Sequence, residues 1–208
     1  MQQTIDMLEQ YFQQLPRFVR EHSERVSDYL QLFINQMLRL QLKEQYPALT
    51  PLVRDNIGLL GRYHDIGKTG VDDELWMSTA PLTEDEQKLA HIHTILGAHL
   101  LRRKLWLPNQ GVDQSDLRNM IADCCLYHHE RWDGTGYPFE LKEQRIPFHV
   151  RMISIADAFD AMTADRPYHA GISKALAIQE IRAEAGKQFD PALAEIFSSV
   201  FNRETTFG

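Results

Sequence analysis

The sequence predicts an all-α fold of seven or so helices. Apolar residues recur at helical spacing along most of the 208 residues, and no stretch shows the alternation typical of a half-buried strand. Capping patterns mark helix starts, since Thr50 precedes Pro51 and Thr83 stands three residues before Glu86. We therefore expect a compact multi-helix bundle.

The expected helices follow one another along the chain. An amphipathic segment at about residues 1–16 either packs on the rest of the domain or pairs in a homodimer, with packing slightly favoured. The spacing of apolar residues then predicts helices at about 17–44, 51–64, 83–106, 115–129, 147–164, 173–185 and 191–202.

The segment from residue 130 to residue 145 interrupts this helical pattern. The dipeptides Asp133-Gly134, Thr135-Gly136 and Tyr137-Pro138 follow one another in quick succession, and such pairs mark turns. A long ordered loop in a compact helical domain is usually functional, so we expect this loop to take part in a site.

Length, charge and composition limit the classes of function. The length fits one domain that spans residues 1–208. The net charge of −7 argues against binding a DNA or RNA polymer, because long nucleic acids are bound by basic surfaces. No run of about 20 apolar residues predicts a membrane span, and the first residues lack the features of a secretory signal. The expected location is therefore the cytoplasm.

Histidine and aspartate gather in two short motifs, HDIGK from His64 to Lys68 and HHERWDGTGYP from His128 to Pro138. Imidazole and carboxylate together suit Fe, Mn, Zn or Ni better than Ca or Mg. Other histidines share helix faces with apolar residues: His22 lies between Phe18 and Val26, and His93 lies between Leu89 and Leu96. Side chains at this spacing are expected to face the core. Any one of them alone would more often be a structural core histidine than a ligand.

The two motifs resemble the signatures of the HD-GYP family, a branch of the HD metal-dependent phosphohydrolases. HDIGK matches the HD motif, and the second stretch matches HHExxDGxGYP at every defined position. Further segments resemble the family in the family's order, over about residues 22–197: GVDDELWMSTAPLTEDE, HTILGAHLL, IADAFDAMTADRPY and GKQFDP. The resemblance implies an HD-domain bundle with a metal site in its core. It also implies a bacterial signalling enzyme that hydrolyses cyclic-di-GMP to pGpG, with further cleavage to GMP left open.

The resemblance implies a site for two divalent metal ions, with iron or manganese preferred over nickel, zinc or cobalt. It places seven candidate ligands there, with Asp65 bridging the ions: His22, His64, Asp65, His93, His128, His129 and Asp157. A hydroxide bridging the two ions would attack phosphorus in line. Asp160 is expected to support the site without binding metal. Phe18 stands where three-metal members carry a glutamate, and because its ring cannot bind metal, two ions are expected.

The same resemblance suggests which residues meet the substrate: Lys68, Gly136, Tyr137, Pro138 and Arg166. Lys68 is expected to act in catalysis beside Asp65, as a positive charge near the scissile phosphate. A guanidinium such as that of Arg166 suits a phosphodiester, and Tyr137 offers a ring for stacking or hydrogen bonding.

Some residues of metal-binding type are expected to stay outside the site. The adjacent cysteines predict small packed residues on a buried helix face rather than a disulfide or metal ligands. The remaining histidines fall outside the matched positions and are expected to be ordinary, partly exposed residues. These are Cys124, Cys125, His91, His99, His149 and His169.

Two other functions stay open. One is a non-catalytic signalling module that binds cyclic-di-GMP or a diguanylate cyclase through the loop at 133–138. The other is an HD phosphohydrolase that acts on another cyclic dinucleotide or on a nucleotide phosphate. The intact ligand positions favour an enzyme over a binding module, and the complete second signature favours cyclic-di-GMP over other nucleotides.

Overall fold

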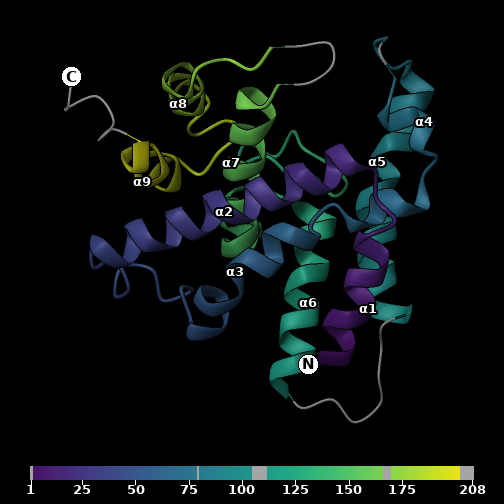
Figure 1. Cartoon of the computed structure of the whole chain (residues 1–208). Coiled ribbons are helices and arrows are strands. Elements are labelled where there is room, and N and C mark those ends of the chain that lie inside the picture. The colour runs from purple at the N-terminus through teal and green to yellow at the C-terminus, as the bar shows by residue number, and fades with distance from the viewer. Residues whose placement is uncertain (1, 79, 105–111, 166–169, 202–208) are drawn as a thin grey trace.

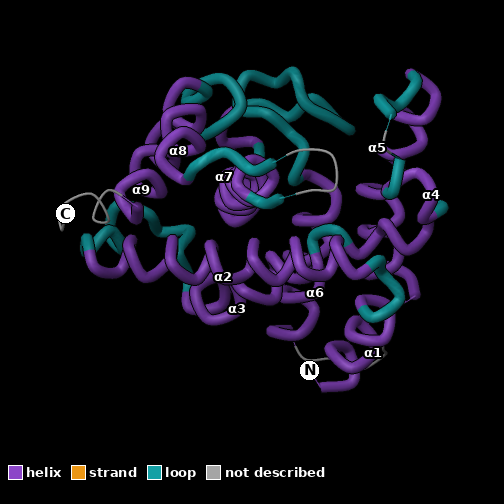
Figure 2. The backbone as a smooth tube through the Cα atoms, turned by 45° about the horizontal axis from the view of Figure 1, so that its top comes forward, coloured by secondary structure: helices purple, strands orange, loops and turns teal. Residues whose placement is uncertain are grey.

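The computed structural model of the chain describes residues 2–78, 80–104, 112–165 and 170–201, and these residues form helices joined by loops, with no strand among them (Figures 1 and 2). The all-α prediction is confirmed. The longer helices are α1 (Gln2–Phe12), α2 (Arg17–Arg39), α3 (Pro51–Tyr63), α5 (Glu84–His99), α6 (Val112–Tyr127), α7 (Phe148–Thr163), α8 (Lys174–Ala183) and α9 (Pro191–Phe201). The shorter turns are η1 (Ile66–Gly70), α4 (Asp73–Trp76), the π-helical η2 (Leu100–Lys104) and η3 (Glu143–Arg145).

Helix α2 lies at the centre of the bundle, where it packs against α3, α7 and α9 (Figure 1). An aromatic cluster joins three of these helices, because the ring of Phe197 lies 5.2 Å from that of Phe33 and 5.3 Å from that of Phe159. All three rings are fully buried. None of the described helices combines the length and the apolar character needed to cross a membrane.

The first helix packs on the rest of the chain, as the sequence favoured. Leu8 and Phe12 are fully buried, and the Phe12 ring meets the Tyr63 ring edge-on at 5.8 Å. The guanidinium of Arg62 lies 4.0 Å from the Phe12 ring centre and donates hydrogen bonds to Glu9. These contacts hold α1 against the end of α3, close to the HD motif. Pairing in a homodimer stays a prediction.

Two helix ends differ from the predicted positions. Helix α2 ends at Arg39 rather than near residue 44, because Gln41 takes a left-handed conformation (φ 56°) and the Leu42 amide donates to the Met37 carbonyl. This is a Schellman-type helix end. Its left-handed position usually holds glycine, and because glutamine stands there, the sequence does not mark the end of the helix. Helix α6 ends at Tyr127, so the paired histidines lie just beyond it rather than inside it. Residues 105 and 106, predicted as helix, lie outside the described part of the chain.

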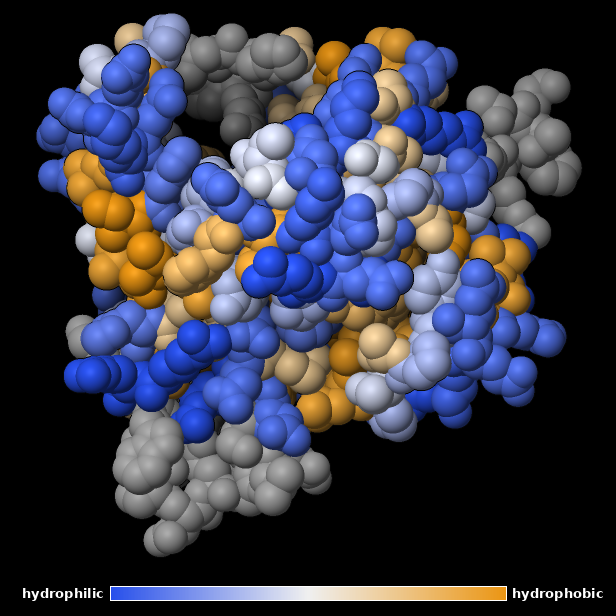
Figure 3. Space-filling view, turned by 180° about the vertical axis from the view of Figure 1, so that it is seen from behind, coloured by the Kyte–Doolittle hydropathy of each residue, from blue (hydrophilic) through white to orange (hydrophobic). Residues whose placement is uncertain are grey.

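Helix α5 also turns a different face inward than its apolar residues suggested. Leu89 is exposed, together with Ile92 and Ile95. Figure 3 views the molecule from behind, so α5, which is at the right of Figure 1, lies at its left, and an apolar patch is visible on that side. The buried side carries Ala90, His93, Thr94, Gly97 and Ala98 instead. Small residues allow another segment to approach the helix closely at this position.

That segment is η1, the turn formed by HDIGK. A Cβ added to Gly67 would lie 2.0 Å from the His93 carbonyl oxygen and 2.4 Å from the Gly97 amide nitrogen. The backbones of η1 and α5 are therefore in direct contact, and only glycine fits between them. This contact fixes Asp65 and Lys68 relative to His93.

We expect Gly67→Ala to destabilise the fold by about 3 kcal/mol, because the added methyl group meets backbone atoms that cannot rotate away. Gly58→Ala is the matched control. Gly58 lies inside α3, and its new methyl would meet only the Ser27 hydroxyl oxygen, at 3.0 Å. The control should change stability by less than about 1 kcal/mol. Urea unfolding followed by circular dichroism measures both, and equal stabilities would contradict the close packing.

Candidate metal centre

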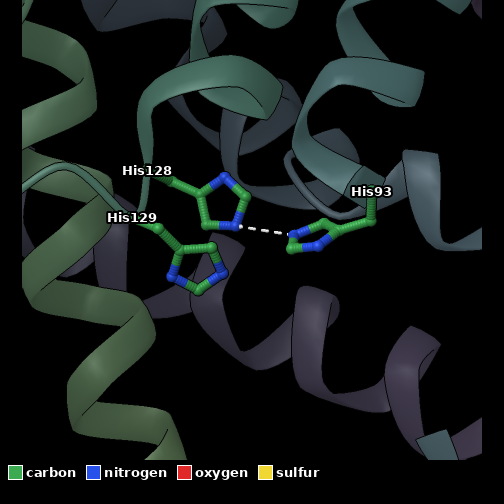
Figure 4. Close-up of side chains that lie close together, drawn as sticks. All are labelled: His93, His128 and His129. Atoms are coloured by element: carbon green, nitrogen blue, oxygen red, sulfur yellow. Dashed lines mark hydrogen bonds between the residues drawn. The ribbon is translucent and has the colours of Figure 1, made fainter. Parts of the chain in front are cut away.

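The seven candidate ligands come from five parts of the fold and meet in one place. His22 lies on α2, His93 on α5 and Asp157 on α7, whereas the two adjacent pairs follow the ends of α3 and α6. Three sets of three have ligand atoms within 4.8 Å of one another. The sets are His93, His128 and His129; His22, His64 and Asp65; and His64, His128 and Asp157. Figure 4 shows the first set, with the three rings turned toward one another.

Asp65 lies between two groups of histidines. Its Oδ1 is 3.4 Å from Nε2 of His93 and 3.6 Å from Nε2 of His128. Its Oδ2 is 3.6 Å from Nε2 of His64 and 3.8 Å from Nε2 of His22. Each carboxylate oxygen therefore faces its own pair of imidazole nitrogens, which is the arrangement that a carboxylate bridging two cations needs.

The backbone fixes the tautomers of three of these histidines. Nδ1 of His64 donates to the Gly61 carbonyl at 2.6 Å, and Nδ1 of His93 donates to the Ala90 carbonyl at 2.6 Å. Nδ1 of His128 donates to the Cys124 carbonyl at 2.9 Å. A carbonyl can only accept, so the proton of each neutral ring lies on Nδ1. The lone pair of Nε2 then points into the centre, as in histidines that bind metal.

These lone pairs have no protein donor to satisfy them. Nε2 of His93 and Nε2 of His128 lie 3.3 Å apart, joined by the dashed line in Figure 4, yet neither neutral ring has a proton to share there. Nε2 of His64 and Oδ1 of Asp65 are buried without a hydrogen-bond partner among the described residues. Buried acceptors rarely stay unpaired in folded proteins. A cation between them satisfies all four atoms, so the residues present fit a divalent metal site.

The charges of the centre divide between one protonated histidine and several neutral ones. Burial lowers the pKa of His22, but hydrogen bonds to Asp157 and Asp160 outweigh burial and raise that pKa to about 9. Burial lowers the pKa of His129 to about 3, and it lowers the pKa of His64 and His128 as well. Without metal, the buried carboxylates are therefore balanced by His22 and Lys68.

Asp160 supports His22 without belonging to any of the three sets, in agreement with the sequence interpretation. It is fully buried, and its Oδ2 accepts the Nδ1 proton of His22 at 2.7 Å. Arg25 donates to both oxygens of Asp160, at 2.6 and 2.9 Å. This chain of contacts orients the His22 ring so that Nε2 faces Asp157 at 3.0 Å.

Contacts within the loop after α6 fix its conformation. Buried Glu130 accepts hydrogen bonds from the Phe139 amide at 2.7 Å and the Leu141 amide at 2.9 Å. A Cβ on Gly136 would lie 2.4 Å from the Arg131 amide nitrogen, so glycine is required there by packing within the loop. The substrate contacts expected of Gly136 and Pro138 stay predictions.

Tyr137 stacks on two imidazole rings. Its ring lies 4.8 Å from that of His129 and 3.6 Å from that of His91, almost parallel to the latter. Sequence reasoning missed this role of His91, whose only signal was its position two residues before His93. His149, expected to be partly exposed, is buried. The two cysteines are buried, as expected.

A cavity of about 610 Å³ opens onto the centre. Its volume lies within the range of small-molecule sites, about 300–1,000 Å³. Four candidate ligands and the cation Lys68 line it, together with the apolar side chains of Phe18, Trp76 and Met77. Lys68 donates to Oδ2 of Asp65 at 2.5 Å. Arg166, the expected phosphate contact, lies outside the described residues.

Residues 48–193 match the family model described as HD domain. With both signature motifs gathered at the buried centre, this match decides the family. The chain belongs to the HD-GYP family of HD domains. Bd1817, an HDG"Y"P protein from Bdellovibrio bacteriovorus, shares the fold of this HD-GYP chain with a TM-score of 0.60 and 18% identity, over 88% of this chain and 52% of the other.

Curated relatives of this HD-GYP chain have names that describe phosphodiesterases. It is 39% identical over 160 residues to the cyclic di-GMP phosphodiesterase PA4108 of Pseudomonas aeruginosa, covering 77% of this chain and 36% of the relative. It is 31% identical over 133 residues to the 3'3'-cGAMP-specific phosphodiesterase 2 of Vibrio cholerae, covering 64% of this chain and 24% of the relative. The chain thus spans about a third or less of the length of these relatives.

Metal binding to this HD-GYP chain should release a proton from His22. Because the pKa of His22 is about 9 without metal, Nε2 must lose a proton to bind an ion at neutral pH. We expect the apparent affinity for Mn²⁺ to rise about tenfold per pH unit between about pH 7 and 8.5. Titration calorimetry in two buffers of different protonation enthalpy counts the protons released.

His129→Ala is the matched control for this experiment. It also removes a candidate ligand, but the pKa of His129 is about 3, so this ring is already neutral. The control should weaken Mn²⁺ binding and keep the proton release, whereas His22→Ala should weaken binding and abolish the release. An affinity independent of pH in the wild-type protein would contradict the assignment.

Proposed function

We propose that this chain is a metal-dependent phosphodiesterase that hydrolyses cyclic-di-GMP to pGpG, with cleavage of pGpG to GMP as an open second step. The proposal rests chiefly on Asp65, whose two oxygens face separate pairs of imidazole nitrogens beside a cavity large enough for a nucleotide. The name of the Pseudomonas relative supports the choice of substrate.

Seven residues would hold two divalent ions, with Asp65 between them: His22, His64, Asp65, His93, His128, His129 and Asp157. Their nitrogen and carboxylate atoms suit iron or manganese, and also nickel, zinc or cobalt. Ions held there would supply activation of a water nucleophile and neutralisation of charge on the phosphodiester. The protein keeps the ligand lone pairs oriented through the Nδ1 hydrogen bonds, so little reorganisation is needed when metal binds.

Lys68 would supply the protein's own positive charge to the phosphodiester. Its ammonium group lies at the boundary between the buried centre and the cavity, where it donates to Asp65 and lies 5.1 Å from the centre of the Trp76 ring. A fixed cation next to the reacting phosphate stabilises the negative charge that builds up on its oxygens.

Cyclic GMP-AMP is the second candidate substrate, and the name of the Vibrio relative favours it. The chemistry at phosphorus would be the same, and the two substrates differ in one purine base. Two alternatives remain: docking of a diguanylate cyclase at the loop 133–138, and a cyclic-di-GMP-binding module without catalysis. An activity assay separates both from the enzyme.

Protein loaded with Mn²⁺ or Fe²⁺ under anaerobic conditions should convert cyclic-di-GMP to pGpG, resolved by chromatography. Asp65→Ala should lower the rate by at least about 100-fold, because loss of the central carboxylate removes several kcal/mol of metal-dependent stabilisation. Asp55→Ala, which removes an exposed carboxylate on α3, is the control and should react like the wild type. Cyclic GMP-AMP assayed in parallel ranks the two substrates.

If protein with confirmed metal content hydrolyses neither dinucleotide, the proposed enzymatic function is wrong. Binding of cyclic-di-GMP that survives Asp65→Ala, without turnover, would then favour the signalling module. Turnover by Asp65→Ala at the wild-type rate would place the chemistry elsewhere.

Lys68→Met should lower kcat by about 100-fold and leave the metal content unchanged, because the lysine is proposed to act on the phosphate and not on the ions. Lys88→Met, which removes an exposed lysine paired with Asp85 on α5, is the matched control. Steady-state kinetics with metal analysis of each variant separates the two roles. Loss of metal from Lys68→Met would show instead that the lysine maintains the centre.

A further inference from the structure

We infer that Phe18, together with Met77, forms a platform for a purine base of the substrate. The inference rests on the proposed function and extends it, because it assigns the part of the cavity that recognises the base rather than the phosphate. Phe18 lies on the first turn of α2, and Met77 directly follows α4. Both line the cavity that opens onto the candidate metal centre.

The exposure of these two side chains is the first observation. Phe18 is 44% exposed and Met77 is 55% exposed, although both are large and apolar. Single exposed apolar residues are common, but these two both line the same cavity. Apolar and aromatic side chains concentrated in a cavity that also holds a few charged groups are typical of ligand sites.

The position of Phe18 relative to His22 is the second observation. The two residues are four positions apart on α2, so they lie on the same face and about 6 Å apart along the axis. A phosphodiester at the His22 end of the cavity would therefore leave its base one helical turn away, beside Phe18. One ribose joins phosphate and base, which matches this arrangement.

The third observation is that other aromatic rings near the centre are already engaged. Tyr137 stacks with both His91 and His129. Trp76 meets the His93 ring edge-on at 5.7 Å, and Lys68 lies over its face. The Trp76 ring is thus already in contact with side chains of the candidate metal centre. Phe18 has no ring partner among the described residues, so its face is open to a base.

The test compares two ligands that differ only by the base: GMP and ribose 5-phosphate. Titration calorimetry with Mn²⁺-loaded protein measures both affinities, and their ratio isolates the contribution of the base. Stacking of a base on an aromatic side chain corresponds to roughly 5- to 160-fold in affinity. We expect the wild type to bind GMP more tightly than ribose 5-phosphate by a factor in this range.

Phe18→Ala should remove most of this ratio and leave the affinity for ribose 5-phosphate within about twofold, whereas Phe18→Tyr should preserve the ratio. Leu32→Ala is the matched control, since Leu32 is 45% exposed on the same helix, about 21 Å along the axis from Phe18. It should leave both affinities unchanged. Phe18 is exposed, so its replacement is compatible with folding.

An unchanged ratio in Phe18→Ala, or an equal loss for both ligands, would overturn the inference. These results are independent of turnover. A protein that hydrolyses cyclic-di-GMP but keeps its ratio in Phe18→Ala retains the proposed function and loses the platform. A protein that hydrolyses neither dinucleotide but shows a Phe18-dependent ratio loses the proposed function and keeps the platform.

Discussion

The buried carboxylate of Asp65 is the constraint on which the rest of the structure depends. A charge in the protein interior is costly unless it is compensated, and the Nε2 atoms of His64, His93 and His128, which lie within 3.6 Å of the carboxylate, offer only lone pairs while their rings are neutral. Lys68 and protonated His22 compensate it in part, and a divalent cation compensates it fully. The fold supplies the ligands from helices far apart in sequence, because no single element could surround one carboxylate.

The positions of the ligands depend on contacts that carry no chemistry. The backbone contact of η1 with α5 at Gly67 fixes Asp65 against His93, and α1 covers the end of the helix that precedes His64. On the opposite side, Arg25 holds Asp160 and Asp160 holds His22. Arg25 also lines the cavity. One side chain therefore both borders the cavity and, through Asp160, orients the candidate ligand His22.

The sequence was sufficient for the helical class, because apolar periodicity is a local property. The gathering of the motif residues at one centre was expected only from the resemblance to the HD-GYP family, since the residues lie far apart in the sequence. The sequence did not predict features that depend on backbone conformation or on close contact between two backbone segments. The end of α2 depends on Gln41 in a left-handed conformation, and the inward face of α5 depends on Gly97 rather than on Leu89. Stacking of His91 on Tyr137 joins two segments about 45 residues apart, and neither segment encodes it alone.

Under the proposed function, the residues that line the cavity would separate chemistry at phosphorus from selectivity for the base. Four candidate ligands and Lys68 line it, and under the proposed function these groups would act alike on any phosphodiester. Phe18 and Met77 also line it, are not among the candidate ligands, and can change without loss of the ligand set. Relatives named for cyclic di-GMP and for 3'3'-cGAMP both match this chain, and those dinucleotides share their phosphodiesters but differ in a base. Under the proposed function, discrimination between the two dinucleotides must therefore come from side chains that contact the base. Phe18, on the first turn of α2, is placed to be one of them.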